Sequence, residues 1–254
     1  MKKVYFFLLI IILISVASAQ DQGLLQVEIQ ELIDQPTAGT LEKGEYGFDV
    51  RLFPYGGALC GLRAGLFDRF MIGVSYGGIN IIGRGEPEWN ELPGVLIKYR
   101  LFEETDLPAV SIGFDSQGYG LWSDGDNRYE TKAKGVFAVA SKNFALEWLG
   151  TLGLHAGINY NSFEDDDDKN LNGFCGFDKS INQQISLVAE YNLGLDDDNE
   201  RAWGRNRGYL NTGIRWIFAE RLGIEVNFKD ILENRKDVSA ISREVRITYV
   251  EKFF

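Results

Sequence analysis

The chain contains a single histidine, His155, and any catalytic triad or histidine-containing metal site would have to use it. A lipid-hydrolysing membrane enzyme would pair this imidazole with a serine, and the candidates Ser111 and Ser186 stand in no distinctive sequence context. We therefore interpret His155 as a hydrogen-bonded side chain of the interior. We predict no catalytic residue, no cofactor and no enzymatic activity.

Two runs of carboxylates could collect divalent cations, because flexible acidic loops supply the oxygen ligands that Ca²⁺ and Mg²⁺ take. They lie at residues 164–168 and 196–200. Neither run has the D-x-D-x-D-G spacing of a dedicated calcium loop. The sequence therefore predicts solvated acidic loops and no metal site.

A third group of candidates consists of single charged residues within segments that otherwise alternate between apolar and polar. Both signs occur, which favours mutual pairing in a narrow or closed interior over a wide aqueous one. The residues that we expect to line such a lumen are Lys98, Arg100, His155, Glu190, Arg215, Glu225, Lys229 and Arg246.

The elements that must position these residues are β-strands, because apolar and polar residues alternate with period two from Glu45 to the C-terminus. The segment from Leu222 to Lys229 alternates strictly, whereas the run from Val136 to Ala140 is apolar throughout and its faces are not assigned. Helical periodicity is limited to a turn near residues 144–149. We expect about twelve strands, at residues 45–53, 57–67, 69–77, 94–102, 108–116, 131–142, 150–160, 173–178, 183–192, 208–218, 221–230 and 242–252.

Alternation alone does not separate a soluble β-sandwich from a membrane barrel, so the connections and the aromatic residues must decide. Apart from the first connection, long polar connections follow the odd strands and short ones follow the even strands, as in outer-membrane barrels. Aromatic residues near strand ends, on or near the apolar face, match the girdles of such barrels; they are Tyr46, Phe70, Tyr76, Tyr160, Tyr191, Tyr209 and Trp216. The alternative is a secreted β-sandwich that binds glycans through Trp89, Trp122 and Trp203.

The N-terminus predicts export from the cytoplasm. Two lysines precede an apolar run, and Ala17-Ser18-Ala19 has the form of a signal-peptidase site, so we expect residues 1–19 to be a cleaved signal peptide. Residues 20–43 are then a lead-in that forms a short strand or a tether, before the barrel at residues 44–254. The chain has 26 basic and 37 acidic residues, and this acidic balance argues against nucleic acid as a partner.

Several motifs carry a resemblance to a known family: Leu-Phe-Pro-Tyr-Gly-Gly at residues 52–57, Gly-Leu-Phe-Asp-Arg-Phe at 65–70, Gly-Val-Ser-Tyr-Gly-Gly-Ile-Asn at 73–80 and Pro-Gly-Val-Leu-Ile-Lys-Tyr-Arg-Leu at 93–101. Together with residues 107–114 and 177–182 they resemble YjbH-like bacterial outer-membrane barrels, across roughly two-thirds of the mature chain. The resemblance implies a barrel that is linked in some relatives to exopolysaccharide production or export. It implies no catalytic residues.

These observations predict an all-β fold, a transmembrane antiparallel up-and-down β-barrel of about twelve strands in the bacterial outer membrane. The expected function is non-enzymatic: transport, polysaccharide-export-associated work or a surface-structural role, with a narrow charged lumen. Expected partners are outer-membrane lipid, a polysaccharide or small solute, and the barrel-insertion machinery through the C-terminal Phe254. The alternatives are the soluble sandwich and, less favoured, a barrel enzyme that hydrolyses lipid.

Overall fold

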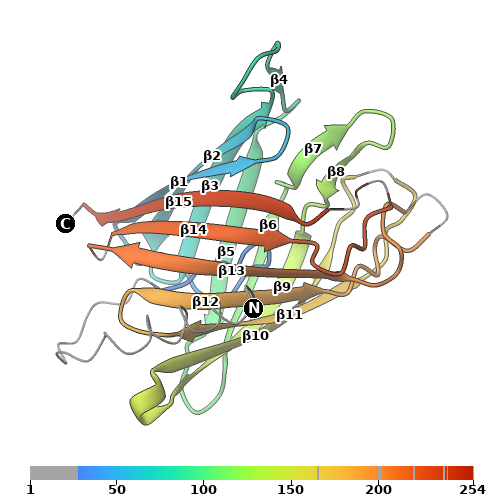
Figure 1. The fold of residues 1–254 in the computed structure, drawn as a ribbon. Helices are drawn as coiled ribbons and strands as arrows, with labels where there is room; N and C mark the ends of the chain where they lie inside the picture. Colours follow the sequence, from blue (N-terminus) through green and yellow to red (C-terminus); the bar gives the residue numbers. More distant parts are fainter. Residues whose placement is uncertain are drawn as a thin grey trace, which may run out of the picture.

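The computed structural model describes residues 28–253, apart from Asp165, Glu200, Arg201, Glu220, Asp237 and Ser239. The expected signal peptide and Phe254 therefore lie outside the described residues. The strands (Figure 1) are β1 (Glu45–Phe53), β2 (Gly57–Phe67), β3 (Phe70–Ile79), β4 (Glu88–Trp89), β5 (Gly94–Phe102), β6 (Ala109–Asp115), β7 (Tyr119–Ser123), β8 (Arg128–Thr131), β9 (Gly135–Ala145), β10 (Thr151–Tyr160), β11 (Asn172–Ser180), β12 (Ile185–Asn192), β13 (Tyr209–Phe218), β14 (Leu222–Lys229) and β15 (Ser242–Lys252), with one 3-10 turn, η1 (Glu147–Leu149). Among the described residues, no helix is long and apolar enough to cross a membrane.

Twelve of the strands form a closed antiparallel barrel in which chain neighbours pair with each other. The ring closes between the first and the last strand, where Glu45 of β1 lies opposite Lys252 of β15. The short strands β4, β7 and β8 belong to connections between barrel strands. Closure leaves no free edge in the ring, which a sheet that spans a membrane requires. The predicted up-and-down barrel is confirmed.

The connections divide the barrel into two ends. The turn end carries the short connections, at residues 68–69, 103–108, 146–150, 181–184 and 219–221. The loop end carries the long ones, at residues 80–93, 116–134, 161–171, 193–208 and 230–241, together with the short connection at residues 54–56. The alternation that the sequence predicted, including its exception after the first strand, is present in the structure.

One predicted strand differs from its observed counterpart. Residues 131–142 were expected to form one strand, but β8 ends at Thr131 and the barrel strand β9 begins at Gly135. Gly135 has a φ of 62°, a left-handed conformation that breaks the extended chain between the two strands. Within the apolar run, Phe137 and Val139 are buried inside the barrel and Val136 is exposed outside.

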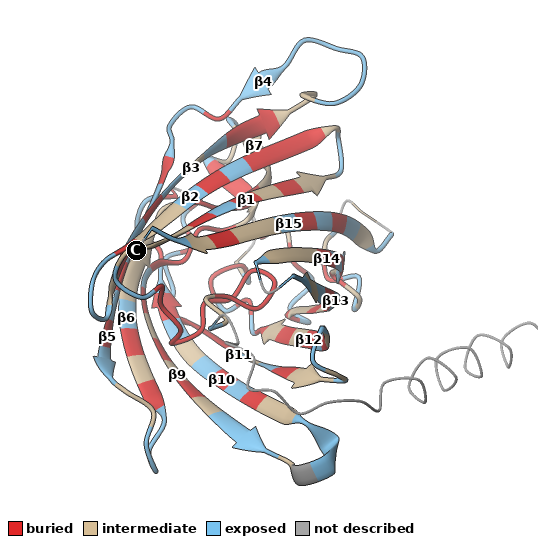
Figure 2. Cartoon of the chain, turned by 90° about the vertical axis from the view of Figure 1, so that its left-hand side faces the viewer, coloured by how far each residue is buried: buried red, intermediate tan, exposed pale blue. Residues whose placement is uncertain are grey.

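The two faces of the barrel wall have opposite chemistry. On β5, Val95, Ile97 and Tyr99 are exposed, whereas the intervening Lys98 and Arg100 are buried. Figure 2 shows buried and exposed bands alternating along the strands. A sandwich buries its apolar faces against each other, so an exposed apolar face around buried charges excludes the soluble-sandwich alternative.

The aromatic residues near strand ends follow the prediction with one exception. Tyr76, Tyr160 and Trp216 are exposed on the apolar outer face. Tyr209 shares its side of β13 with the buried Asn211 and faces inward, where its hydroxyl bonds to the carboxylate of Asp197. The prediction that Tyr209 lies on or near the apolar face is therefore wrong.

Residues 28–41, which we call the plug, lie inside the barrel, where Figure 2 shows a coil of buried chain within the ring of strands. They form a tight turn with one isolated bridge between Glu31 and Pro36, instead of the strand or tether that the sequence suggested. Leu32 and Ile33 pack against Val188 of the wall. The wall is shaped to receive the plug: a Cβ added at Gly176 would lie 2.4 Å from the Cδ1 atom of Leu32.

Candidate functional site

Two carboxylates of the plug meet cations from strands on both sides of the β1–β15 junction. Glu31 pairs with Arg51 at 3.3 Å and also contacts Arg63 and Arg246. Asp34 pairs with Arg51 at 3.0 Å and with Lys229 at 2.7 Å. These charged groups are largely removed from bulk water. Removing one partner of a pair would therefore leave the other charge uncompensated and weaken the binding of the plug.

The wall also binds the backbone of the plug. The Glu190 carboxylate accepts the N–H groups of Ile33, Asp34 and Gln35 at 2.9 Å, and so binds the plug turn through three donors at once. On the opposite side, the Lys98 ammonium donates to the carbonyl oxygens of three plug residues, at 2.7–3.2 Å. Charge-assisted bonds of this kind are stronger than neutral ones.

The structure places all eight sequence-predicted lumen residues on the inner side of the wall. Seven of them are buried and Lys229 is nearly so, with 12% of its side chain exposed. Six contact the plug directly: Lys98, Arg100, Glu190, Arg215, Lys229 and Arg246. Glu225 reaches the plug through its pair with Arg215 at 2.7 Å, and His155 does so through Ser141, which accepts the Ala38 N–H.

Sequence reasoning missed several residues of the same site. Arg51, Arg63 and Glu244 are inward-facing and bind the plug or its partners. Arg51 stands two residues from Asp49 on β1, and both alternate with exposed or half-buried apolar side chains. Period-two alternation of this kind, with the charged positions assigned to the inner face, would have identified these residues.

His155 lies in a network that crosses three strands near the turn end. Its Nδ1 atom is 2.7 Å from the Ser141 hydroxyl, and its Nε2 atom is 2.8 Å from an oxygen of Asp178. Of the two serines that the sequence offered as partners, Ser111 donates to the Ala38 carbonyl instead and Ser186 is buried on β12. The network borders a cavity of about 260 Å³ between the plug and the wall.

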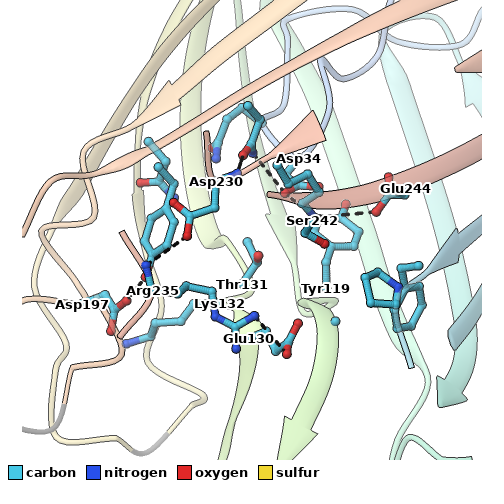
Figure 3. A pocket seen from close by; sticks show the side chains of 18 of the residues that line it. Asp34, Tyr119, Glu130, Thr131, Lys132, Asp197, Asp230, Arg235, Ser242 and Glu244 are labelled. Atoms are coloured by element: carbon cyan, nitrogen blue, oxygen red, sulfur yellow. Dashed lines mark hydrogen bonds and ion pairs between the residues drawn. The ribbon is translucent and has the colours of Figure 1, made fainter. Parts of the chain in front are cut away.

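The opposite side of the plug faces a second, narrower space of about 50 Å³ (Figure 3). Its walls carry both charges in pairs, such as Arg235 with Glu130 at 3.0 Å. A buried water needs roughly 10–15 Å³ of such space, so this one holds a few water molecules and no sugar ring. The plug and the loops above it fill much of the lumen and leave these two spaces between them.

Those loops form a packed group that we call the loop cluster, residues 116–134, 161–171, 193–208 and 230–241 among the described residues. Arg128 pairs with Asp166 at 3.0 Å and with Asp197 at 2.6 Å. Lys132 binds Asp166 at 2.8 Å, and the Trp203 ring packs on Arg128. The prediction of solvated acidic loops is wrong for these carboxylates, because cations from a neighbouring loop neutralise them.

Burial changes the acid chemistry of one loop residue. Burial raises the pKa of the Glu164 carboxyl from 4.5 to about 7, and the Ala133 N–H, which donates to it at 3.1 Å, offsets only part of that rise. In the part of the chain that the structure describes, no group of three or more His, Cys, Asp or Glu side chains is arranged to hold a metal ion.

A closed ring of strands with an apolar outer face and a charged interior is the architecture by which a sheet spans a lipid bilayer. The chain folds as a transmembrane β-barrel. No protein-family model and no curated protein matches it.

Comparison with solved structures finds barrels of the same class at low similarity. The KdgM porin is 10% identical with a TM-score of 0.48, covering 83% of this chain and 99% of that chain. The outer membrane protein Omp33 of Acinetobacter baumannii is 10% identical with a TM-score of 0.46, covering 82% and 97%. The NanC porin is 9% identical with a TM-score of 0.41, covering 83% and 99%. These values carry no functional argument, so the assignment rests on the chain's own closure and burial.

Proposed function

We propose that this protein is a channel for small hydrophilic solutes across the outer membrane, held closed at rest by the plug. The observation that carries the proposal is the filling of a charged lumen by one short segment that is not part of the barrel wall. A purely surface-structural barrel could fill its interior with wall side chains alone. A segment that is separate from the wall and is held by ion pairs that can break and re-form is able to move.

The solute class follows from the lumen lining. Inward-facing Lys98, Arg215 and Glu225 give the interior both signs of charge, which suits polar solutes that exchange hydration water for hydrogen bonds with the wall. The resemblance to YjbH-like barrels supports a saccharide within this class and a polysaccharide-associated setting. The exposed apolar belt is the surface that would contact outer-membrane lipid, with the loop end outside the cell.

Conductance in planar bilayers tests the proposal directly. The full-length protein is compared with a double variant, Asp34→Asn with Glu190→Gln, which removes the charges that hold the plug turn and keeps the side-chain shapes. The matched control is Asp68→Asn with Glu86→Gln, the same two replacements at exposed positions. Heat-dependent migration on SDS gels confirms that each barrel is folded.

We expect rare, small openings in the unsubstituted protein and in the control, and a rise of at least about tenfold in open time in the double variant. Liposome swelling with small sugars should increase in parallel. A large steady conductance that is equal in all three proteins would show that the plug does not close the lumen. Folded barrels that conduct in none of the three forms would rule out the channel.

A further inference from the structure

Ser141, His155 and Asp178 have the arrangement of a nucleophile, a general base and a carboxylate that orients the base. The Ser141 Oγ atom is 2.7 Å from Nδ1 of His155, and Nε2 of the same ring is 2.8 Å from Oδ1 of Asp178. When Nε2 carries the ring hydrogen and donates it to Asp178, Nδ1 is free to accept the Ser141 proton. The two ring nitrogens exchange the roles that they have in chymotrypsin-type triads, and the chain of proton partners is the same.

The barrel holds the three residues together by register. His155 of β10 is the direct cross-strand partner of Ser141 of β9. Asp178 of β11 lies opposite Gly153, one inward-facing position from His155, which puts it on the diagonal that long side chains reach. Gly153 leaves the space clear, since a Cβ there would lie 2.3 Å from the Asp178 oxygen.

The same residues border the roomier cavity of the lumen. Its volume is about 260 Å³, and the plug residues Ile29, Thr37 and Gly39 form its other wall. An apolar cavity of about 150 Å³ accommodates benzene, so this one has room for a small ester. The Ala38 N–H lies 2.8 Å from the Ser141 oxygen. This N–H donates to the serine oxygen and helps to hold it in place beside the cavity.

The geometry points to a second activity, hydrolysis of small carboxylic esters in the turn-end cavity, with Ser141 as nucleophile, His155 as general base and Asp178 as positioning residue. It goes beyond the proposed channel and replaces the expectation that His155 is only structural. The Ser141 oxygen bonds to the acyl carbon while its proton passes to Nδ1 of His155, and this proton then leaves with the alkoxide as the ester C–O bond breaks. A water molecule attacks the acyl-serine by the same route, which releases the carboxylic acid and restores the hydroxyl.

A fluorophosphonate probe, which phosphonylates activated serines, tests the inference on the full-length protein in detergent. We expect stoichiometric labelling of Ser141, located by peptide mass, and hydrolysis of p-nitrophenyl acetate. Ser141→Ala should abolish both, and His155→Ala should lower the labelling rate at least about 10²-fold, with partial rescue by added imidazole. Asp178→Asn should lower kcat by a similar factor and leave KM unchanged.

Ser186→Ala is the matched control, because Ser186 is also buried and does not line the cavity. This variant should label and hydrolyse like the unsubstituted protein. All variants are checked for heat-dependent gel migration, so that only folded barrels are compared. A folded, unsubstituted protein that stays unlabelled at millimolar probe, or labelling that persists in Ser141→Ala, would overturn the inference.

Discussion

The plug and the loop cluster close the same lumen with the same kinds of ion pair, yet they are built differently. The plug is a single segment whose carboxylates bind cations of the wall, as Asp34 does with Arg51 and Lys229. The loop cluster consists of several loops whose charges bind one another, as Arg128 does with Asp166 and Asp197. Each of those loops is anchored in the barrel at both of its ends.

In the channel that we propose, this difference would separate a movable closure from a fixed one. Moving the plug breaks contacts with the wall and leaves the strands paired. Moving the loop cluster requires several loops to separate from one another at the same time. Changes at the plug should therefore alter conduction and overall stability, and changes at the loop cluster should act locally.

The largest effect is expected from Arg51→Met, which removes the common partner of Glu31, Asp34 and Glu244. Breaking three buried ion pairs at once should cost about 5 kcal/mol of unfolding free energy, the upper end for a broken buried pair, although Glu31 keeps Arg246 and Asp34 keeps Lys229. Urea unfolding of the barrel in lipid vesicles measures it. Arg221→Met is the control, since Arg221 is 59% exposed in its pair and should leave the midpoint unchanged. Equal midpoints for both variants would contradict the role given to Arg51.

Arg128→Met should have a smaller effect, confined to the loop end. It leaves Asp166 and Asp197 without Arg128 while Lys132 still neutralises Asp166, so we expect a loss of about 3 kcal/mol in the local opening free energy. Hydrogen exchange resolved by peptide should show faster exchange in residues 161–171 and 193–208. Faster exchange in the plug as well would show that the two closures move as one.

The smallest effect is a pH dependence that Glu164 gives to the loop cluster. Its folded pKa of about 7 exceeds the unfolded value of 4.5, so the folded state binds the extra proton between these pH values. The resulting stabilisation is complete below pH 4.5 and is lost as the pH rises through 7, and between pH 5 and pH 8 it falls by about 2–3 kcal/mol locally. Hydrogen exchange of the loop at pH 5 and pH 8 measures this difference. Glu164→Gln should abolish it, and Glu91→Gln, at an exposed position, should retain it.

The barrel wall could be predicted from the sequence because its determinants are local. Period-two alternation defines β5 and β14 almost to the residue, and the lengths of the connections order them into a barrel. The same alternation located Lys98 and Glu190 on the inner face. Phe137 and Ser141 were missed because the surrounding run is apolar on both faces, which removes the signal.

The plug could not be predicted in the same way. Residues 28–41 have neither a helical nor a strand period, and their conformation is set by groups on distant strands, such as Glu190. Sequence separations of about 155 residues join the plug turn to its carboxylate partner. Only the folded ring brings these groups together, so the conformation of the plug depends on tertiary contacts that the local sequence pattern does not reveal.

The junction of β1 and β15 gives the plug a part in assembly. Arg51 and Arg246 are direct cross-strand partners there, and both are buried. Like charges in that position oppose strand pairing, and Glu31 of the plug binds both of them. The plug therefore neutralises like charges where the first and last strands pair, so the segment that fills the lumen also stabilises the closure of the ring.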